Sequence, residues 1–275
     1  MLTLIATPIG NLQDISQRSR IAMEEADILA CEDTRQTKKL IQLLGLSVSA
    51  RLIAYHDHNG AKMRPAILSA LAKGQKVGLV SDAGTPLISD PGYKLVKEVR
   101  QAGYPVTATA GASAPILALI LSGLPSDRFL FHGFLPDKQK QAQSQLDECK
   151  TLSVTHLFFV SPSQLVKNLE LIAACFGDRQ ASLVREITKL HEEVIAGNLS
   201  ELADSYHTNP VPKGELVLVV GPAEKQIDYS ETEITAILEQ RLSELSVRDA
   251  VSEVASLTGQ PRKTIYQMAL ALQKP

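Results

Sequence analysis

The chain has 275 residues, of which 44% are apolar, and a formal net charge of −2. This length is sufficient for two packed α/β domains with an appendage. The charge excludes the broad basic field of a protein that binds bare nucleic-acid duplexes unaided, although a local basic patch remains compatible with it. Trp is absent and aromatic residues are few, so no stacking platform for single-stranded nucleic acid is expected.

Cysteine usage and hydropathy set the expected compartment. Cys31, Cys149 and Cys175 are widely spaced and lack the close pairs of zinc and iron–sulfur sites. They predict a reducing cytoplasm and no bound metal. The first apolar run ends at Thr7 and has no basic flank, which fits neither a signal peptide nor a membrane span. A cytoplasmic protein without membrane segments is therefore expected.

The first part of the chain alternates predicted strands and helices. Strands are expected at residues 2–7, 28–31, 51–55, 77–80 and 106–109. Helices are expected within 11–26 and over 37–44, 65–72, 95–102 and 115–122. This alternation is typical of a parallel sheet covered by helices. It predicts an N-terminal α/β domain over residues 1–122.

The pattern is interrupted at Gly123–Asp127 and Phe129–Pro136, where we place a domain boundary. A second α/β domain is expected over 123–224, with helices at 140–149, 164–176 and 199–206 and strands at 156–160, 181–185 and 215–220. Residues 224–243 are interpreted as a polar transition. Two short helices, 246–257 and 262–272, then flank a glycine turn and predict a helix-turn-helix-like tail over 225–275, which could read nucleic acid or serve as a packed cap.

One loop carries the strongest functional signal. The apolar run Val77–Val80 is followed by a turn-rich segment, Ser81–Gly92, that contains two carboxylates. A buried parallel strand that ends in such a loop delivers polar groups where open α/β sheets bind ligands. Similar small-residue loops follow the first and fifth strands, which predicts one shared ligand site. Asp82 and Asp90 could together carry acid–base chemistry or hold a metal. Asp82 is expected to act in this site, whereas for Asp90, which precedes Pro91, the interpretation as a helix cap is favoured.

Other polar segments leave alternatives open. No glycine-rich phosphate loop follows any strand. The sequence therefore lacks the main motifs of nucleoside triphosphate hydrolysis and of ordinary dinucleotide binding. His56 and His58 could share a metal ion but lack a clear third ligand. Arg35 suits phosphate binding or an internal salt bridge with its acidic neighbours, and the cluster from Arg185 to Lys189 offers the same two interpretations. Gly214 could allow a ligand to approach the backbone.

Nine ordered motifs resemble a known family. They cover residues 2 to about 221 of the chain, and the helical tail is similar to the extension of many family members. The family is that of the RsmI-type 16S ribosomal RNA cytidine 2′-O-ribose methyltransferases, within the tetrapyrrole methylase superfamily. The motifs are Ala6–Leu12, Cys31–Arg35, His56–Asn59, Leu79–Gly92, Gly111–Ala114, Ser122–Pro125, Gly133–Pro136, Val184–Lys189 and Lys213–Leu218.

The resemblance implies S-adenosylmethionine as the methyl donor, bound between two α/β domains, and a homodimer. It implies as substrate a cytidine in the decoding region of 16S rRNA, presented within the small ribosomal subunit. For a ribose hydroxyl that attacks the donor methyl, Asp82 is the candidate general base and His56 the second candidate. Arg35, Arg185 and Lys189 are candidates for contacts to RNA phosphate. Carried over by position, the donor site would use Pro8, Asp82, Ala83, Gly84, Thr85, Ile88, Ser113, Ala114, Phe158, Phe159, Val160 and Gly214.

The chain departs from the family at one motif. Where relatives usually carry a glutamate, a histidine and an arginine, this chain has Val160, Ser163 and Gln164. A tetrapyrrole or other small-molecule methyltransferase of the same fold, or a non-catalytic RNA-binding relative, is therefore the alternative. From residue 241 to the end the tail holds five basic and three acidic side chains, which predicts a modest basic patch that helps to dock RNA.

Overall fold

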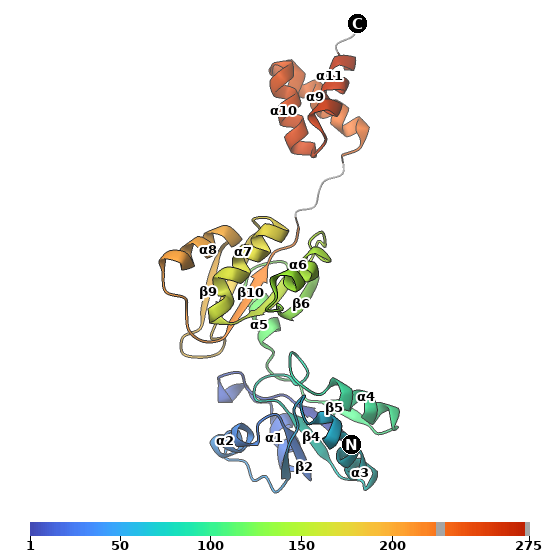
Figure 1. Cartoon of the computed structure of the whole chain (residues 1–275), viewed down its shortest axis with the longest axis vertical. Helices are drawn as coiled ribbons and strands as arrows, with labels where there is room; N and C mark the ends of the chain where they lie inside the picture. Colours follow the sequence, from blue (N-terminus) through green and yellow to red (C-terminus); the bar gives the residue numbers. More distant parts are fainter. Residues whose placement is uncertain (224–228, 273–275) are drawn as a thin grey trace. The chain divides into compact units, whose positions relative to one another are not determined.

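The computed structural model describes residues 1–223 and 229–272. The chain forms two compact units, Met1–Ala223 and Glu224–Pro275 (Figure 1). The first unit contains two five-stranded sheets, and the described part of the second is helical. Among the described residues, no helix combines the length and the apolar character needed to cross a membrane.

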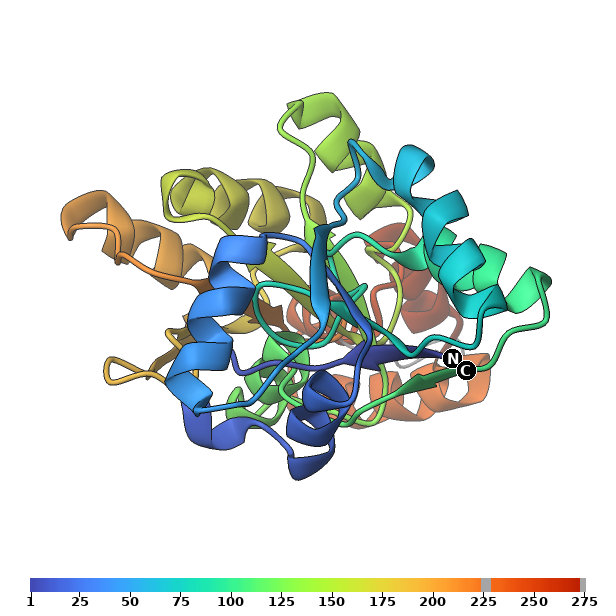
Figure 2. The ribbon, with the colours of Figure 1, turned by 90° about the horizontal axis from the view of Figure 1, so that it is seen from below.

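The first sheet is parallel throughout and has the strand order β3-β2-β4-β1-β5. Its strands are β1 (Leu2–Ile5), β2 (Ile28–Cys31), β3 (Arg51–Ala54), β4 (Val77–Val80) and β5 (Val106–Ala108). Helices α1 (Gln17–Glu24) and α2 (Thr34–Leu44) pack on one face, and α3 (Gly60–Ala72) and α4 (Tyr93–Gln101) pack on the other (Figure 2). Five parallel strands therefore send their loops to one edge of the sheet.

Local capping shifts the helix starts from the expected positions. Helix α2 begins three residues early, because the side chain of Asp33 accepts a hydrogen bond from the backbone N–H of Arg35 and caps the helix. It ends at Gly45 in the left-handed conformation, as predicted. Helix α3 begins at Gly60, so Pro65, which was expected near the start, lies inside the helix.

The second sheet is mixed and has the order β6-β7-β10-β8-β9. Its strands are β6 (Phe129–Phe134), β7 (Thr155–Val160), β8 (Gln180–Arg185), β9 (Glu193–Asn198) and β10 (Leu216–Val220). Strands β6 and β7 run parallel, and the other neighbours are antiparallel. The sequence did not predict β6 or β9, because both are edge strands with little burial and β6 is interrupted by an irregularity between Phe131 and Phe134.

Helices cover both faces of the second sheet. Helices α6 (Gln139–Asp147), α7 (Leu165–Phe176) and α8 (Leu199–Thr208) enclose one apolar core with β7, β8 and β10. On the other face, α5 (Ala114–Leu121) joins a second core that includes Ile9 and Ala112 from loops of the first sheet. This shared core ties the loops of the first sheet to the second sheet.

The described part of the tail contains three helices, α9 (Glu231–Glu244), α10 (Val247–Thr258) and α11 (Arg262–Leu272). The interpretation of residues 224–243 as a polar transition is wrong for α9, and residues 224–228 lie outside the described part. Ser230 and Glu233 form a capping box at the start of α9, and Ile234 and Leu238 bury one face of it. The tail has its own core, to which all three helices contribute.

Candidate functional site

The three small-residue loops meet at the carboxyl edge of the first sheet, as predicted. The backbone N–H of Thr7 donates to the carbonyl of Gly84 over 2.9 Å. The hydroxyl of Thr85 donates to the carbonyl of Ala112 over 2.8 Å. A Cβ atom at Gly111 would lie 2.4 Å from the Cβ of Ala6, so these two loops touch through the missing side chain. We call this contact region, residues 6–10, 81–92 and 109–113, the loop junction.

The loop after β4 holds unusual backbone conformations. Leu87 and Ser89 have φ angles of 75° and 67°, and side chains other than glycine rarely adopt such values. Helix α4 begins at Tyr93, with Gly92 at its N-cap position. The prediction that Asp90 caps this helix is therefore wrong, because the turn at Gly92 separates Asp90 from the first helical residue.

Four acidic residues cluster in and beside the loop junction: Asp82 and Asp90 belong to it, and Glu32 and Asp33 lie next to it. The carboxylate of Asp82 accepts a hydrogen bond from the backbone N–H of Asp33 over 3.1 Å, and the N–H of Asp82 donates to the carboxylate of Glu32 over 3.4 Å. Although Asp82 is exposed as a residue, its surroundings raise the pKa of its carboxyl, chiefly by desolvation. Burial raises the pKa of Asp90 to about 6, and the charges of Glu32 and Asp82 add to the rise.

His56 lies with Asp90 rather than with Asp82. Both residues line a cavity of about 370 Å³ between the loop after β3 and the start of α4. The Nδ1 atom of His56 is buried and makes no hydrogen bond with any described residue. The sequence pairs Asp90 with Asp82 as two carboxylates of one loop, but Pro91 favoured the interpretation of Asp90 as a helix cap.

We expect Asp90→Asn to stabilise the protein above neutral pH. The pKa of Asp90 is higher in the folded state than the ordinary 3.8, so the folded state favours the protonated form and loses stability as pH rises from about 4 through 6. The amide should therefore raise the free energy of unfolding by about 1–2 kcal/mol at pH 7.5, and the gain should shrink toward pH 4.

Thermal unfolding of wild type and Asp90→Asn across this pH range measures the effect. Asp57→Asn is the matched control, because Asp57 lines the same cavity but is exposed. A gain that does not depend on pH would assign the effect to something other than the charge of Asp90.

The second sheet contributes one aromatic side chain of the predicted donor site. Phe159 packs in the core shared with the first sheet, and its ring lies 5.0 Å from that of Phe131 and 5.3 Å from that of Phe134. Phe158 and Val160 point to the opposite face of the sheet, into the core beneath α6, α7 and α8. Because side chains alternate along a strand, these two can offer a ligand only their backbone.

Lys189 connects the second sheet to the loop junction. The position that a Cβ atom would take at Gly10 lies 2.3 Å from the Cγ of Lys189, so the lysine stem crosses directly over this glycine. Its ammonium pairs with Glu186 over 2.9 Å and with Glu215 over 3.3 Å. Gly214 lies against the side chain of Glu186 and has a φ of 106°. Lys189, predicted to contact RNA, thus pairs with Glu186 and Glu215, and Gly214, predicted to contact the donor, packs against Glu186.

The other two predicted RNA contacts differ in their surroundings. Arg185 pairs with Glu193 over 3.1 Å and donates to the carbonyl of Lys213 over 2.9 Å, so its guanidinium is partly used. The side chain of Arg35 is 88% exposed and pairs with Asp33 over 2.6 Å. Hydrogen bonds from Arg35 lower the pKa of Asp33 to about 2. Arg35 remains the more accessible of the two cations.

The remaining donor-site candidates lie in or next to the loop junction. Pro8 is buried beside Thr7, and Ile88 is exposed in the loop after β4. Ser113 occupies the N-cap position of α5 without capping it through its side chain, and Ala114 begins that helix. Ala83 is exposed beside Asp82. These positions come from three loops that touch one another at Gly84, Thr85 and Gly111.

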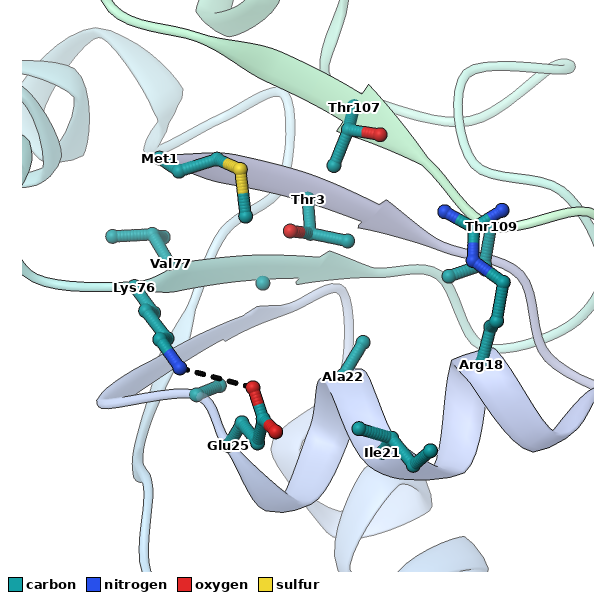
Figure 3. A pocket seen from close by; sticks show the side chains of 12 residues that line it. Met1, Thr3, Arg18, Ile21, Ala22, Glu25, Lys76, Val77, Thr107 and Thr109 are labelled. Atoms are coloured by element: carbon teal, nitrogen blue, oxygen red, sulfur yellow. Dashed lines mark hydrogen bonds and ion pairs between the residues drawn. The ribbon is translucent and has the colours of Figure 1, made fainter.

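A separate pocket of about 220 Å³ lies on the face of the first sheet beside α1 (Figure 3). The hydroxyl-bearing residues Thr3, Thr107 and Thr109 line it, together with Arg18, which donates to the carbonyl of Ala108 over 3.4 Å. The pair of Lys76 and Glu25, 2.9 Å apart, lines its other end. Its lining contains none of the residues predicted for the functional site.

Comparison with known proteins identifies the family. Residues 1–203 match the sequence model of the tetrapyrrole (corrin/porphyrin) methylases, and residues 228–273 match that of the RsmI C-terminal HTH domain. The fold is similar to that of diphthine synthase, with a TM-score of 0.62 and 19% identity over 80% of this chain and 89% of that chain. It also resembles uroporphyrin-III C-methyltransferase from Thermus thermophilus complexed with S-adenyl homocysteine, with a TM-score of 0.54 and 16% identity over 79% and 96% of the two chains.

The chain is therefore a tetrapyrrole methylase by fold and family, which makes it a member of a methyltransferase class. A protein of Mesorhizobium japonicum, named ribosomal RNA small subunit methyltransferase I, is 45% identical over 273 residues, which cover 99% of this chain and 92% of the relative. Within the tetrapyrrole methylases, the chain belongs to the family of ribosomal RNA small subunit methyltransferase I.

Proposed function

We propose that this protein transfers a methyl group from S-adenosylmethionine to the ribose 2′-hydroxyl of a cytidine in the decoding region of 16S rRNA. The main support is the loop junction, which places small residues and carboxylates together in a chain whose relatives are named for the small-subunit RNA. We further propose that it acts in the cytoplasm on RNA presented by the small ribosomal subunit.

The loop junction fits the proposed donor. Gly84 and Gly111 let the three loops pack closely, because a Cβ atom would lie 3.1 Å from Ile9 Cγ2 at Gly84 and 2.4 Å from Ala6 Cβ at Gly111. Asp82 and the exposed Ile88 lie in the same loop, and Phe159 and Lys189 approach from the second sheet. When bound, S-adenosylmethionine supplies an electrophilic methyl group on a sulfonium. The chain would hold it mainly with backbone groups of the junction.

The acidic residues beside the junction supply the proton acceptor in this proposal. The reacting hydroxyl must lose its proton as it attacks, and a carboxylate with a raised pKa accepts a proton near neutral pH more effectively than an ordinary one. Asp82 lies at the end of β4 in the junction, and Asp90 is its neighbour with a pKa of about 6. Val160 stands where the family resemblance implies a glutamate, so this position supplies no carboxylate in this chain.

Mass mapping of 16S rRNA tests the assignment. RNA from cells that lack this protein should lose one 2′-O-methyl group on a cytidine, and the wild-type gene should restore it. A gene that carries Asp82→Asn should restore it much less. An unchanged methylation map, with methyl transfer to a small molecule instead, would favour the alternative substrate class.

The tail offers a local site for phosphate. Its described residues include four basic and six acidic side chains, so the folded tail as a whole is not basic. Arg248 and Arg262 nevertheless line one groove with the exposed Tyr266 between α10 and α11. Asp249 lines this groove too, and Arg262 donates to the hydroxyl of Ser252. Arg241 instead pairs with two carboxylates, those of Glu244 and Glu253. We propose that this groove contacts RNA.

A chain that ends at Ala223 should bind the donor normally but bind 16S RNA more weakly. The slope of log affinity against log salt should flatten by roughly one unit for each phosphate that the tail neutralises in the full chain. In the full chain, replacing both Arg248 and Arg262 by alanine should reproduce this change, whereas Arg241→Ala should not. Unchanged RNA binding by the shortened chain would make the tail a structural cap.

We also propose a homodimer. Helix α5 is apolar, yet Ile116, Ile120 and Leu121 are 42%, 64% and 39% exposed on it. Side chains of this kind grouped on one helix are typical of an interface, and a second copy of the chain is the occupant implied by the family resemblance. Sedimentation should give twice the mass of one chain, and Ile120→Asp should shift the equilibrium toward the monomer. A monomeric wild type would refute the proposal.

A further inference from the structure

Three possible metal ligands meet in the core of the second sheet. His132 comes from β6, His156 from β7, and Cys149 from the turn after α6. One ligand atom from each lies within 4.8 Å of the other two. His156 and Cys149 are buried, and His132 is partly buried. The sequence did not suggest this site, because positions 132, 149 and 156 lack the close spacing typical of metal ligands.

The packing around the cluster holds these side chains in place. The ring of His132 stacks on that of Phe158, with centroids 4.3 Å apart and planes only 7° from parallel. The ring of His156 lies 4.7 Å from that of Phe176. His132 Nε2 and His156 Nδ1 are 3.0 Å apart. Two nitrogens on one tetrahedral zinc ion lie about 3.3 Å apart, given bonds of about 2.0 Å, so a small opening would admit an ion.

The ring nitrogens outside the pair formed by His132 Nε2 and His156 Nδ1 would not bind the ion. His156 Nε2 is one of them; it is buried and makes no hydrogen bond with any described residue, and the ion does not change this. In a metal site, the ring nitrogen that does not bind the ion commonly donates to a carbonyl or a carboxamide. The amide of Gln145 lies 3.5 Å from His132 Nδ1 and could accept that proton after an amide turn.

The charge state of the cluster suits an ion that favours nitrogen and sulfur. Burial lowers the pKa of both histidines to about 4, so their imidazoles are neutral at physiological pH. Desolvation raises the pKa of the Cys149 thiol, so an ion has to displace its proton. The guanidinium of Arg179, which lies over the ring of Phe176, repels a cation but favours the thiolate.

We propose that His132, Cys149 and His156 bind one thiophilic d10 metal ion, Zn²⁺ or Cu⁺. Two imidazoles and a thiolate are ligands that both ions accept, whereas Mg²⁺ and Ca²⁺ require oxygen. The cluster lies in the core beneath α6 and α7, on the other face of the sheet from Phe159. The ion would link β6, β7 and the end of α6, and it has no part in methyl transfer.

Metal titration of the full-length protein tests this site. After treatment with a chelator under reducing conditions, the protein is titrated separately with Zn²⁺ and with Cu⁺, and binding and thermal unfolding are measured. One of the two ions should bind with a stoichiometry of one per chain and raise the unfolding temperature. Cys149→Ser should weaken that binding at least about tenfold, since it replaces a thiolate by a poor ligand.

Cys175→Ser is the matched control, because Cys175 lies in the same half of the unit but outside the cluster. It should bind the ion as wild type does. Unfolding of metal-free Cys149→Ser shows whether the variant folds, and His132→Gln gives a second, partly buried position. Absence of one-to-one binding for both ions, or equal binding by wild type and a folded Cys149→Ser, would overturn the proposal. Neither result bears on the methyltransferase assignment.

Discussion

Asp82→Asn is expected to slow methyl transfer by about 10²-fold or more while donor affinity stays within severalfold of wild type. The amide keeps the oxygen that accepts the hydrogen bond from Asp33, so the loop should keep its conformation. It removes the charge that would accept the proton of the ribose hydroxyl. Single-turnover methylation of 16S RNA, together with calorimetry of donor binding, separates the two effects.

The pH dependence of the rate adds a second criterion. If the carboxylates act as proposed, the wild-type rate rises with pH through the region near 6 in which Asp90 titrates. Asp57→Asn, at an exposed position outside the acidic cluster, should leave the rate unchanged. Full activity of Asp82→Asn would remove Asp82 from the mechanism and would transfer the role of base to Asp90 or His56.

Gly111→Ala is expected to weaken donor binding by about tenfold or more. The added Cβ would lie 2.4 Å from the Cβ of Ala6, so the loops after β1 and β5 must move apart at the place where the donor is proposed to bind. Misplacement of about 1 Å at a reactive site can reduce a rate by about 10²-fold. Calorimetric titration with S-adenosylmethionine measures the first effect, and initial rates measure the second.

Gly103→Ala provides the control for this substitution. Gly103 has a positive φ of 80°, and a Cβ there would meet no atom within 4 Å. Its replacement should therefore reduce stability through backbone strain without any change in donor affinity. If both variants lose donor affinity to the same extent, the loss in Gly111→Ala is not caused by separation of the loops at the loop junction.

The sequence was informative where buried strands lead directly into polar loops. The apolar run Val77–Val80 followed by Asp82 predicted a parallel strand with a functional loop, and the hydrogen bond between Thr7 and Gly84 confirms that the loops gather. Such features depend on residues close together in sequence, and the carboxyl ends of parallel strands necessarily share one edge. The alternation of helices and strands predicted the fold class for the same reason.

The errors concern features that depend on tertiary packing. Helix α9 has a polar surface, and only its packing against α10 and α11 shows that Ile234 and Leu238 form a buried face. Asp90 resembled a cap, because the turn at Gly92 that separates it from α4 is not evident locally. Phe158 and Phe159 lie on opposite faces of β7, and only Phe159 packs with the loops of the first sheet. Which of the two faces does so depends on how the sheets pack, and the sequence of β7 does not contain this information.

The separate core of the tail has a thermodynamic consequence. Its buried side chains come only from residues of the tail, so its folding free energy is supplied by a segment of fewer than 60 residues, a size at which cores are marginally stable. A single melting temperature then does not describe the whole chain. On heating, we expect the smaller unit to unfold first. The enzyme would then keep its methylating machinery at temperatures where the proposed RNA-binding groove of the tail no longer exists.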